Sequence, residues 1–147
     1  MNTVKRAKSD DRERVERFLV QAGLNIEGID DILDNFFLLE NSQKSIVGTL
    51  GVEIKGNRGL LRSLAIAPSV PEEDLFTLFE TARVDSRDRG LSTIFLATSK
   101  ATSVALFQFL GFELLDASSF HTELHSFEYF HQIKNVDNCF LMKCKLA

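Results

Sequence analysis

The fold can be worked out from the segment Leu60-Leu61-Arg62-Ser63-Leu64-Ala65-Ile66-Ala67-Pro68, because it is an apolar run of strand length that ends at a proline. Immediately before it, Lys55-Gly56-Asn57 has the composition of a hairpin turn. Residues 46–54 alternate with period two, with Ile46, Leu50, Val52 and Ile54 on one side. The sequence therefore predicts two antiparallel strands joined by a tight turn.

Towards the N-terminus, the pattern predicts a strand at Thr3–Lys8, a helix opened by an Asp10-x-x-Glu13 capping box, a short helix at 28–35 and a strand at Phe36–Glu40. Towards the C-terminus, Ser69-x-x-Glu72 predicts the cap of a helix that continues towards Gly90. The remaining predicted elements are a strand at Ser92–Thr98, a helix at Ala101–Leu110, a strand at Phe112–Leu115, partial helix within 121–131 and a strand at Cys139–Leu146.

This order predicts a mixed α+β fold, with a central, mostly antiparallel sheet of six to seven strands and helices on both faces. No repeat or linker interrupts the 147 residues, so residues 1–147 are expected to form a single domain. Cys139 and Cys144 are expected to be reduced packing residues, because odd spacing on one strand would place them on opposite faces.

The composition excludes several classes of protein. The net charge of -4 argues against a nucleic-acid partner, and the chain has no apolar stretch of membrane-spanning length. Residues 1–15 are too charged for a secretory signal, so the expected location is cytoplasmic. A homodimer is compatible with the sequence but not indicated by it.

Two segments in this order resemble the GCN5-related N-acetyltransferase (GNAT) superfamily. Leu60–Pro68 is similar to the family's fourth strand, and Ala105-Leu106-Phe107-Gln108-Phe109-Leu110-Gly111-Phe112-Glu113 is similar to its helix-to-strand passage. The resemblance covers essentially the whole chain. It implies a GNAT-like fold with splayed fourth and fifth strands, and transfer of an acetyl group from acetyl-CoA to an amine by direct attack.

The resemblance also implies site residues. The thioester oxygen would be held by main-chain N–H groups of Leu64, Ala65 and Ile66. The family's glycine-rich pyrophosphate loop corresponds here to Ser69-Val70-Pro71-Glu72-Glu73-Asp74-Leu75-Phe76, which has no glycine, arginine or glutamine. Glu72, Asp74 and Leu75 would then border the phosphates, where carboxylates oppose anion binding.

Two further positions depart from the family pattern. Phe107 stands where members often have the tyrosine that protonates the leaving thiolate, and phenylalanine has no proton to give. Lys100 replaces an asparagine that often contacts the pantetheine arm. It is expected either to reach a phosphate or to be a solvated lysine at a helix start.

The remaining candidates concern the acceptor. Glu53 is the predicted general base, the alternatives being a solvent-facing glutamate or a partner of Arg62. Strict alternation places Arg62 on the same face as Leu60 and Leu64, where it would bind a substrate carboxylate or pair with a structural acid. Phe120 and Tyr129 are expected to line the acceptor pocket or to pack over the sheet.

A metal site is not expected. His121 and His125 are four residues apart, and His131 follows, but no further ligand stands at motif spacing.

The sequence therefore predicts an N-acetyltransferase for a small amine or amino-acid-like acceptor, with acetyl-CoA as co-substrate and no metal. A weak similarity of Gly59–Leu64 to acetyltransferases associated with arsenic resistance assigns no substrate. Two alternatives stay open: a catalytically inactive GNAT-fold protein that senses a ligand or binds a protein, and an enzyme that uses another acyl donor.

Overall fold

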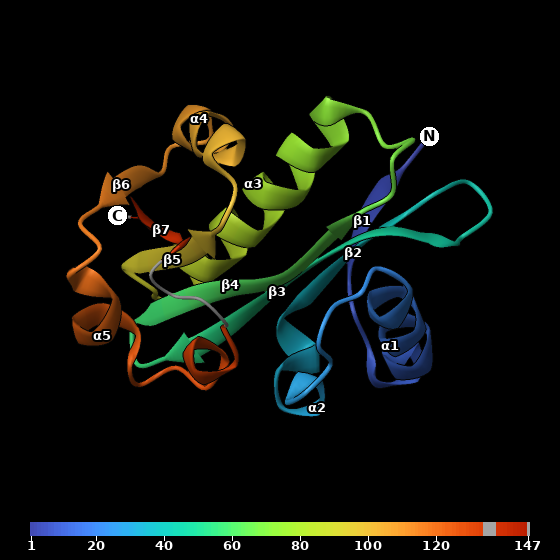
Figure 1. Ribbon diagram of the computed structural model, residues 1–147. Helices are drawn as coiled ribbons and strands as arrows, with labels where there is room; N and C mark the ends of the chain where they lie inside the picture. The colour runs from blue at the N-terminus through green and yellow to red at the C-terminus, as the bar shows by residue number, and fades with distance from the viewer. Residues whose placement is uncertain (134–137, 147) are drawn as a thin grey trace. The chain divides into compact units, whose positions relative to one another are not determined.

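The computed structural model describes residues 1–133 and 138–146 (Figure 1). The strands are β1 (Thr3–Arg6), β2 (Phe36–Glu40), β3 (Ile46–Lys55), β4 (Arg58–Ile66), β5 (Thr93–Thr98), β6 (Glu113–Leu115) and β7 (Phe140–Lys145). The helices are α1 (Arg12–Gln21), α2 (Ile29–Ile32), α3 (Glu72–Asp88), α4 (Ala101–Phe109) and α5 (Ser119–Leu124), with 3-10 turns at Ser9–Asp11, Leu33–Asn35 and Tyr129–Gln132.

The seven strands have the order β1-β2-β3-β4-β5-β7-β6. The pairs β1–β2, β2–β3, β5–β7 and β6–β7 are antiparallel, whereas β4 pairs with β5 in parallel from Arg58↔Thr93 to Leu60↔Phe95. The predicted mixed, mostly antiparallel sheet is therefore confirmed.

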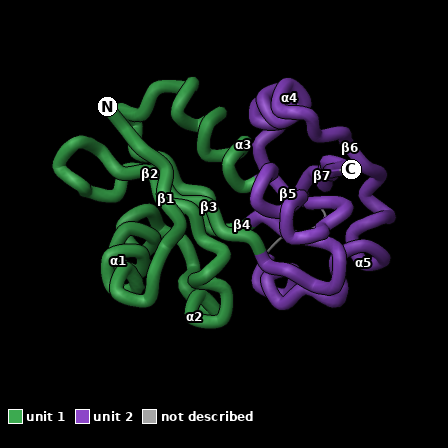
Figure 2. Tube along the Cα trace, turned by 180° about the vertical axis from the view of Figure 1, so that it is seen from behind, with its two compact units in different colours: residues 1–52, 62–82 green, residues 53–61, 83–147 purple. Residues whose placement is uncertain are grey.

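The chain divides into two compact units, and the division passes through β3, β4 and α3 (Figure 2). Unit 1 comprises Met1–Val52 and Arg62–Ala82, and unit 2 comprises Glu53–Leu61 and Arg83–Ala147. The single domain and the splaying of the fourth and fifth strands stay predictions.

Unit 1 is built around β2, all of whose residues are buried. Phe36 and Leu38 pack with Val15 and Leu19 of α1 and with Ile32 of α2. In Figure 1, α1 and α2 lie on one face of these strands and the first half of α3 lies on the other. Because both faces are covered, β2 reads as a continuous apolar run rather than an alternating one.

Unit 2 has an aromatic core. Phe95 of β5 and Leu141 of β7 pack with a group of buried rings from the segment that contains α5, namely Phe120, Phe127 and Phe130. Burying several large rings supplies most of the apolar area of such a small unit.

Both predicted capping boxes lie at the wrong residues. The Asp11 carboxylate, not that of Glu13, reaches back to accept the Lys8 N–H at 2.9 Å, and a 3-10 turn precedes α1. Helix α3 begins at Glu72, three residues after the predicted Ser69 cap, because the Pro71 carbonyl accepts the N–H groups of Asp74 and Leu75.

Candidate active site

The end of β4 contains an unusual backbone conformation in unit 1. Ser63 lies within the strand with a φ of 58°, a left-handed value that non-glycine residues rarely adopt. Its carbonyl oxygen accepts the Thr49 hydroxyl at 2.9 Å, and both residues are buried. A left-handed residue inside a strand interrupts the pleat and the regular hydrogen-bond ladder, as a β-bulge does.

This conformation bears on only part of the expected placement of Arg62: it separates Arg62 from Leu64, whereas the shared face of Leu60 and Arg62 stays a prediction. Strict alternation cannot be carried from Leu60 to Leu64, because the left-handed Ser63 lies between them. Ser63 was not singled out from the sequence as a site residue, since a serine in an apolar run gives no signal of positive φ.

The predicted thioester-binding residues follow Ser63 directly. Ala65 is buried, and Leu64 and Ile66 are half-buried. A β-carbon at Gly48 would come 2.9 Å from Cδ1 of Ile66, so a larger residue there would displace the flexible end of the Ile66 side chain. Just after β4, the Ala67 N–H donates to the Val47 carbonyl at 2.9 Å.

Arg62 is 4% exposed, and its guanidinium group donates to the protein itself. One terminal nitrogen donates to the Glu27 carbonyl at 2.9 Å, and Nε donates to the Ser63 hydroxyl at 3.2 Å. A buried cation needs such partners. Binding of a substrate carboxylate by Arg62 stays a prediction.

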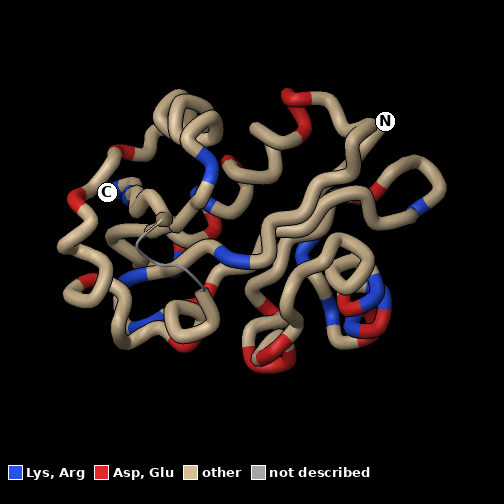
Figure 3. The backbone as a smooth tube through the Cα atoms, in the orientation of Figure 1, with Lys and Arg blue, Asp and Glu red and all other residues tan. Residues whose placement is uncertain are grey.

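The start of α3 carries Glu72, Glu73 and Asp74 in its first turn, and Figure 3 shows this end of the helix as acidic. Glu72 and Glu73 are exposed, and the Asp74 carboxylate accepts the Asn2 amide at 2.9 Å. Acidic side chains suit a helix N-terminus but oppose a second anion there. The side chains of this turn therefore do not fit a pyrophosphate.

Glu53, the predicted base, belongs to unit 2 and is only 5% exposed. One carboxylate oxygen accepts the N–H of Glu128 at 2.6 Å, and the other accepts the N–H of Tyr129 at 2.9 Å. The solvent-facing alternative is therefore wrong. The carboxylate supports the start of the 3-10 turn Tyr129–Gln132, whose first N–H groups have no carbonyl partner within the turn.

The two aromatic candidates differ in position. Phe120 is 2% exposed and lies inside the unit 2 core, whereas Tyr129 is half-buried and packs against that core. Tyr129 is itself one of the two residues whose N–H groups donate to Glu53. A role of either ring in an acceptor pocket stays a prediction.

On α4, Phe107 is buried and contacts Phe112 edge to face, with ring centroids 6.2 Å apart. Lys100 precedes the helix with an exposed side chain, and its N–H donates to the Thr98 hydroxyl at 3.2 Å. Neither contact tests the predicted cofactor roles.

Two expectations concern metals and thiols. Within residues 1–133 and 138–146, no group of three or more histidine, cysteine or acidic side chains could hold a metal ion. The Nδ1 atom of His125 lies 2.8 Å from the His121 carbonyl, and Nε2 of His131 lies 3.0 Å from the His125 carbonyl. Cys139 and Cys144 are both thiols, and burial raises the pKa of Cys139.

None of the helices described could cross a membrane.

One structural cation in unit 2, Arg58, was not identified from the sequence. Arg58 lies over the rings of Phe95 and Phe127, 5.7 and 5.4 Å from their centroids, and donates to the Glu123 carbonyl at 2.7 Å. It ties α5 to the sheet by cation–π and hydrogen-bond contacts.

Several solved structures share this fold. N-acetylglutamate synthase from Neisseria gonorrhoeae, complexed with coenzyme A and N-acetyl-glutamate, matches with a TM-score of 0.79 and 15% identity over 100% of this chain. This chain spans only 35% of that protein. A GNAT-family acetyltransferase from Staphylococcus aureus matches with a TM-score of 0.75 and 16% identity over 100% of both chains.

No protein-family model matches the chain. The YwlB protein of Bacillus subtilis is 33% identical over 138 residues, which are 93% of this chain and 92% of YwlB. This chain therefore belongs to the same family as YwlB, and its fold is that of the GNAT superfamily.

Proposed function

We propose that this protein is a cytoplasmic N-acetyltransferase that moves an acetyl group from acetyl-CoA to the amine of a small, amino-acid-like acceptor. The observation that carries the proposal is the left-handed Ser63 inside β4. Strained residues held in place by their surroundings cluster at functional sites. Here the strain directly precedes the residues to which the GNAT resemblance assigns the thioester oxygen.

In the proposed reaction, acetyl-CoA supplies the activated acyl group. The N–H groups of Leu64, Ala65 and Ile66 are the proposed donors to the developing oxyanion, as fixed main-chain dipoles that need no reorganisation. Arg62 is the proposed partner of an acceptor carboxylate. The N-acetylglutamate synthase match, whose structure holds an acylated amino acid, supports this class of acceptor.

Acetyl-CoA binding is tested by calorimetric titration at low and moderate salt. Micromolar binding supports the proposal, and no detectable binding contradicts it. The double variant Glu72→Gln, Glu73→Gln removes two charges at nearly constant size and is expected to tighten binding about tenfold, if each residual repulsion is roughly 0.7 kcal/mol. This gain should shrink as salt rises. Glu13→Gln, an exposed position on α1, is the matched control.

The role of Glu53 is tested separately, by thiol release from acetyl-CoA with a panel of small amines. If Glu53 is the base, Glu53→Gln lowers kcat and removes the acidic limb of the pH profile of kcat/KM. If Glu53 only supports the 128–129 backbone, the variant changes KM and stability and leaves the shape of that profile intact.

A second candidate function is ligand or protein binding without catalysis. The acidic first turn of α3 and the absence of a hydroxyl at Phe107 favour it. Acetyl-CoA binding without thiol release for any amine in the panel would support this second function.

A further inference from the structure

A slot of about 280 Å³ lies in unit 1, between α1 and the residues that open β3. Its lining residues are Arg14, Arg17, Phe18, Gln21, Lys44, Ser45 and Ile46. Phe18 and Ile46 are half-buried and pack against the core, so they form an apolar floor. The volume is slightly below the usual range for small-molecule sites.

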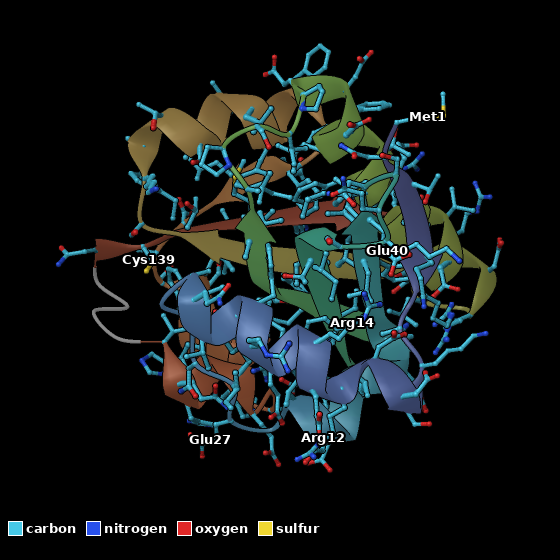
Figure 4. All side chains as sticks on the ribbon, turned by 90° about the vertical axis from the view of Figure 1, so that its right-hand side faces the viewer. Met1, Arg12, Arg14, Glu27, Glu40 and Cys139 are labelled. Atoms are coloured by element: carbon cyan, nitrogen blue, oxygen red, sulfur yellow. The ribbon has the colours of Figure 1, made fainter. Side chains whose placement is uncertain are left out.

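Arg14 holds together the segments that surround the slot. Its guanidinium group donates to the Lys44 carbonyl at 2.8 Å, to Asp11 at 2.8 Å and to Glu40 at 2.7 Å. Figure 4 labels Arg14 on α1 and Glu40 on β2. The charge of Arg14 is thereby balanced, and the helix is tied to the turn that bears Lys44.

Two further cations are not used by the fold. Arg17 and Lys44 are exposed, and within the described part of the chain neither side chain has an ion-pair or hydrogen-bond partner. Glu13, one turn before Arg17 on α1, is also exposed and makes no described bond to Arg17, and the adjacent Glu16 pairs with Arg12. The slot therefore presents two available positive charges on a chain of net charge -4.

Lys44 stands in a conformation that disfavours lysine. Its φ is 62°, in the region where glycine and asparagine are preferred. The turn holds it there, because Asn41 accepts the N–H groups of Gln43 and Ser45 at 2.9 and 3.0 Å. The turn therefore fixes the backbone of Lys44 beside the slot, and its exposed ammonium is available to a ligand.

We propose that this slot binds a small organic dianion with an apolar middle, such as a short dicarboxylate. Arg17 binds one carboxylate with its planar fork, and Lys44 binds the other as a point charge. Phe18 and Ile46 contact the carbon chain, and Gln21 and Ser45 supply neutral hydrogen bonds. The site is independent of the proposed acetyl transfer.

The test is calorimetric titration of the full chain with glutarate at low salt. Saturable binding is expected. It should weaken at least tenfold in Lys44→Gly and in Arg17→Gln and stay unchanged in Lys55→Gln, an exposed lysine outside the slot. Lys44→Gly should keep or raise Tm, since it relieves the strained turn, so lost binding would not reflect unfolding.

Inorganic phosphate carries charge without a carbon chain, and 1,5-pentanediol carries the carbon chain without charge. Both should bind at least tenfold more weakly than glutarate. No saturable glutarate binding, equal binding of phosphate, or unchanged binding in Lys44→Gly would each overturn the proposal. Acetyl-CoA binding by Lys44→Gly should equal that of wild type, which keeps this test separate from the acetyltransferase test.

Discussion

Arg62 in unit 1 and Glu53 in unit 2 are both buried charges on the central hairpin strands, yet they are satisfied differently. Arg62 donates to the Glu27 carbonyl, in the segment before α2, and to the Ser63 hydroxyl. Glu53 accepts two consecutive N–H groups at the start of a 3-10 turn. Each charge binds the main chain of a distant segment, so each holds that segment to the sheet. We expect Glu53 to contribute more to stability, because its carboxylate accepts two N–H groups at the start of a turn.

The substitution Glu53→Ala should have the largest effect on stability. It leaves the N–H groups of Glu128 and Tyr129 without their acceptor, and we expect a loss of about 3 kcal/mol in the free energy of unfolding. Urea unfolding measures the loss, and hydrogen exchange should localise it to residues 128–129. Glu53→Gln retains one acceptor oxygen and should lose less. Equal losses in the two variants would contradict the proposed support.

Asp11 is a third buried charge, but its partners are mainly cationic side chains, whereas Arg62 and Glu53 bind main-chain groups. Burial alone would raise the pKa of Asp11, but bonds from Arg14, the Lys8 N–H and Lys5 outweigh it and lower the pKa from 3.8 to about 2. A lowered folded-state pKa stabilises the fold above the ordinary value, and this stability disappears as the pH falls towards 2.

Asp11→Asn should therefore cost about 2 kcal/mol at pH 7 and roughly half of that at pH 3. Urea unfolding of both proteins at the two pH values measures the difference. A difference that does not change with pH would show that Asp11 acts through packing rather than charge.

Arg62→Met tests the other member of the comparison. Methionine keeps most of the apolar stem and removes the donors to Glu27 and Ser63, so we expect a loss of about 2 kcal/mol. Chemical denaturation measures it, and exchange protection should fall in the segment around Glu27. Faster exchange confined to other segments would be inconsistent with the contact.

Ser63→Gly should have the smallest effect on stability, within about 1 kcal/mol. Glycine relieves the positive φ but removes the hydroxyl that accepts from Arg62, and these changes oppose each other. Ser63→Val cannot adopt this backbone easily and should be destabilised by about 2 kcal/mol. If the valine variant matched wild type in thermal unfolding, the left-handed backbone at this position would be refuted.

Most of the fold could be predicted because local patterns carry it. The period-two run before Lys55, the turn at Gly56 and the apolar run that Pro68 ends gave β3, the hairpin and β4 to within a few residues. Helix starts were less predictable. Several acids near each start can cap it, and only the carbonyl of Lys8 or Pro71 showed where the first turn closes.

The strand and helix order, the GNAT resemblance and the absence of a glycine-rich loop depend on neighbours along the chain, so they could be obtained without the structure. The partners of the buried polar groups are visible only in the folded chain. The Glu27 carbonyl that accepts from Arg62 and the donors to Glu53 lie 35 or more residues away. Main-chain partners leave no mark on residue identity, and the left-handed Ser63 is held by Thr49 of the neighbouring strand rather than by its own sequence.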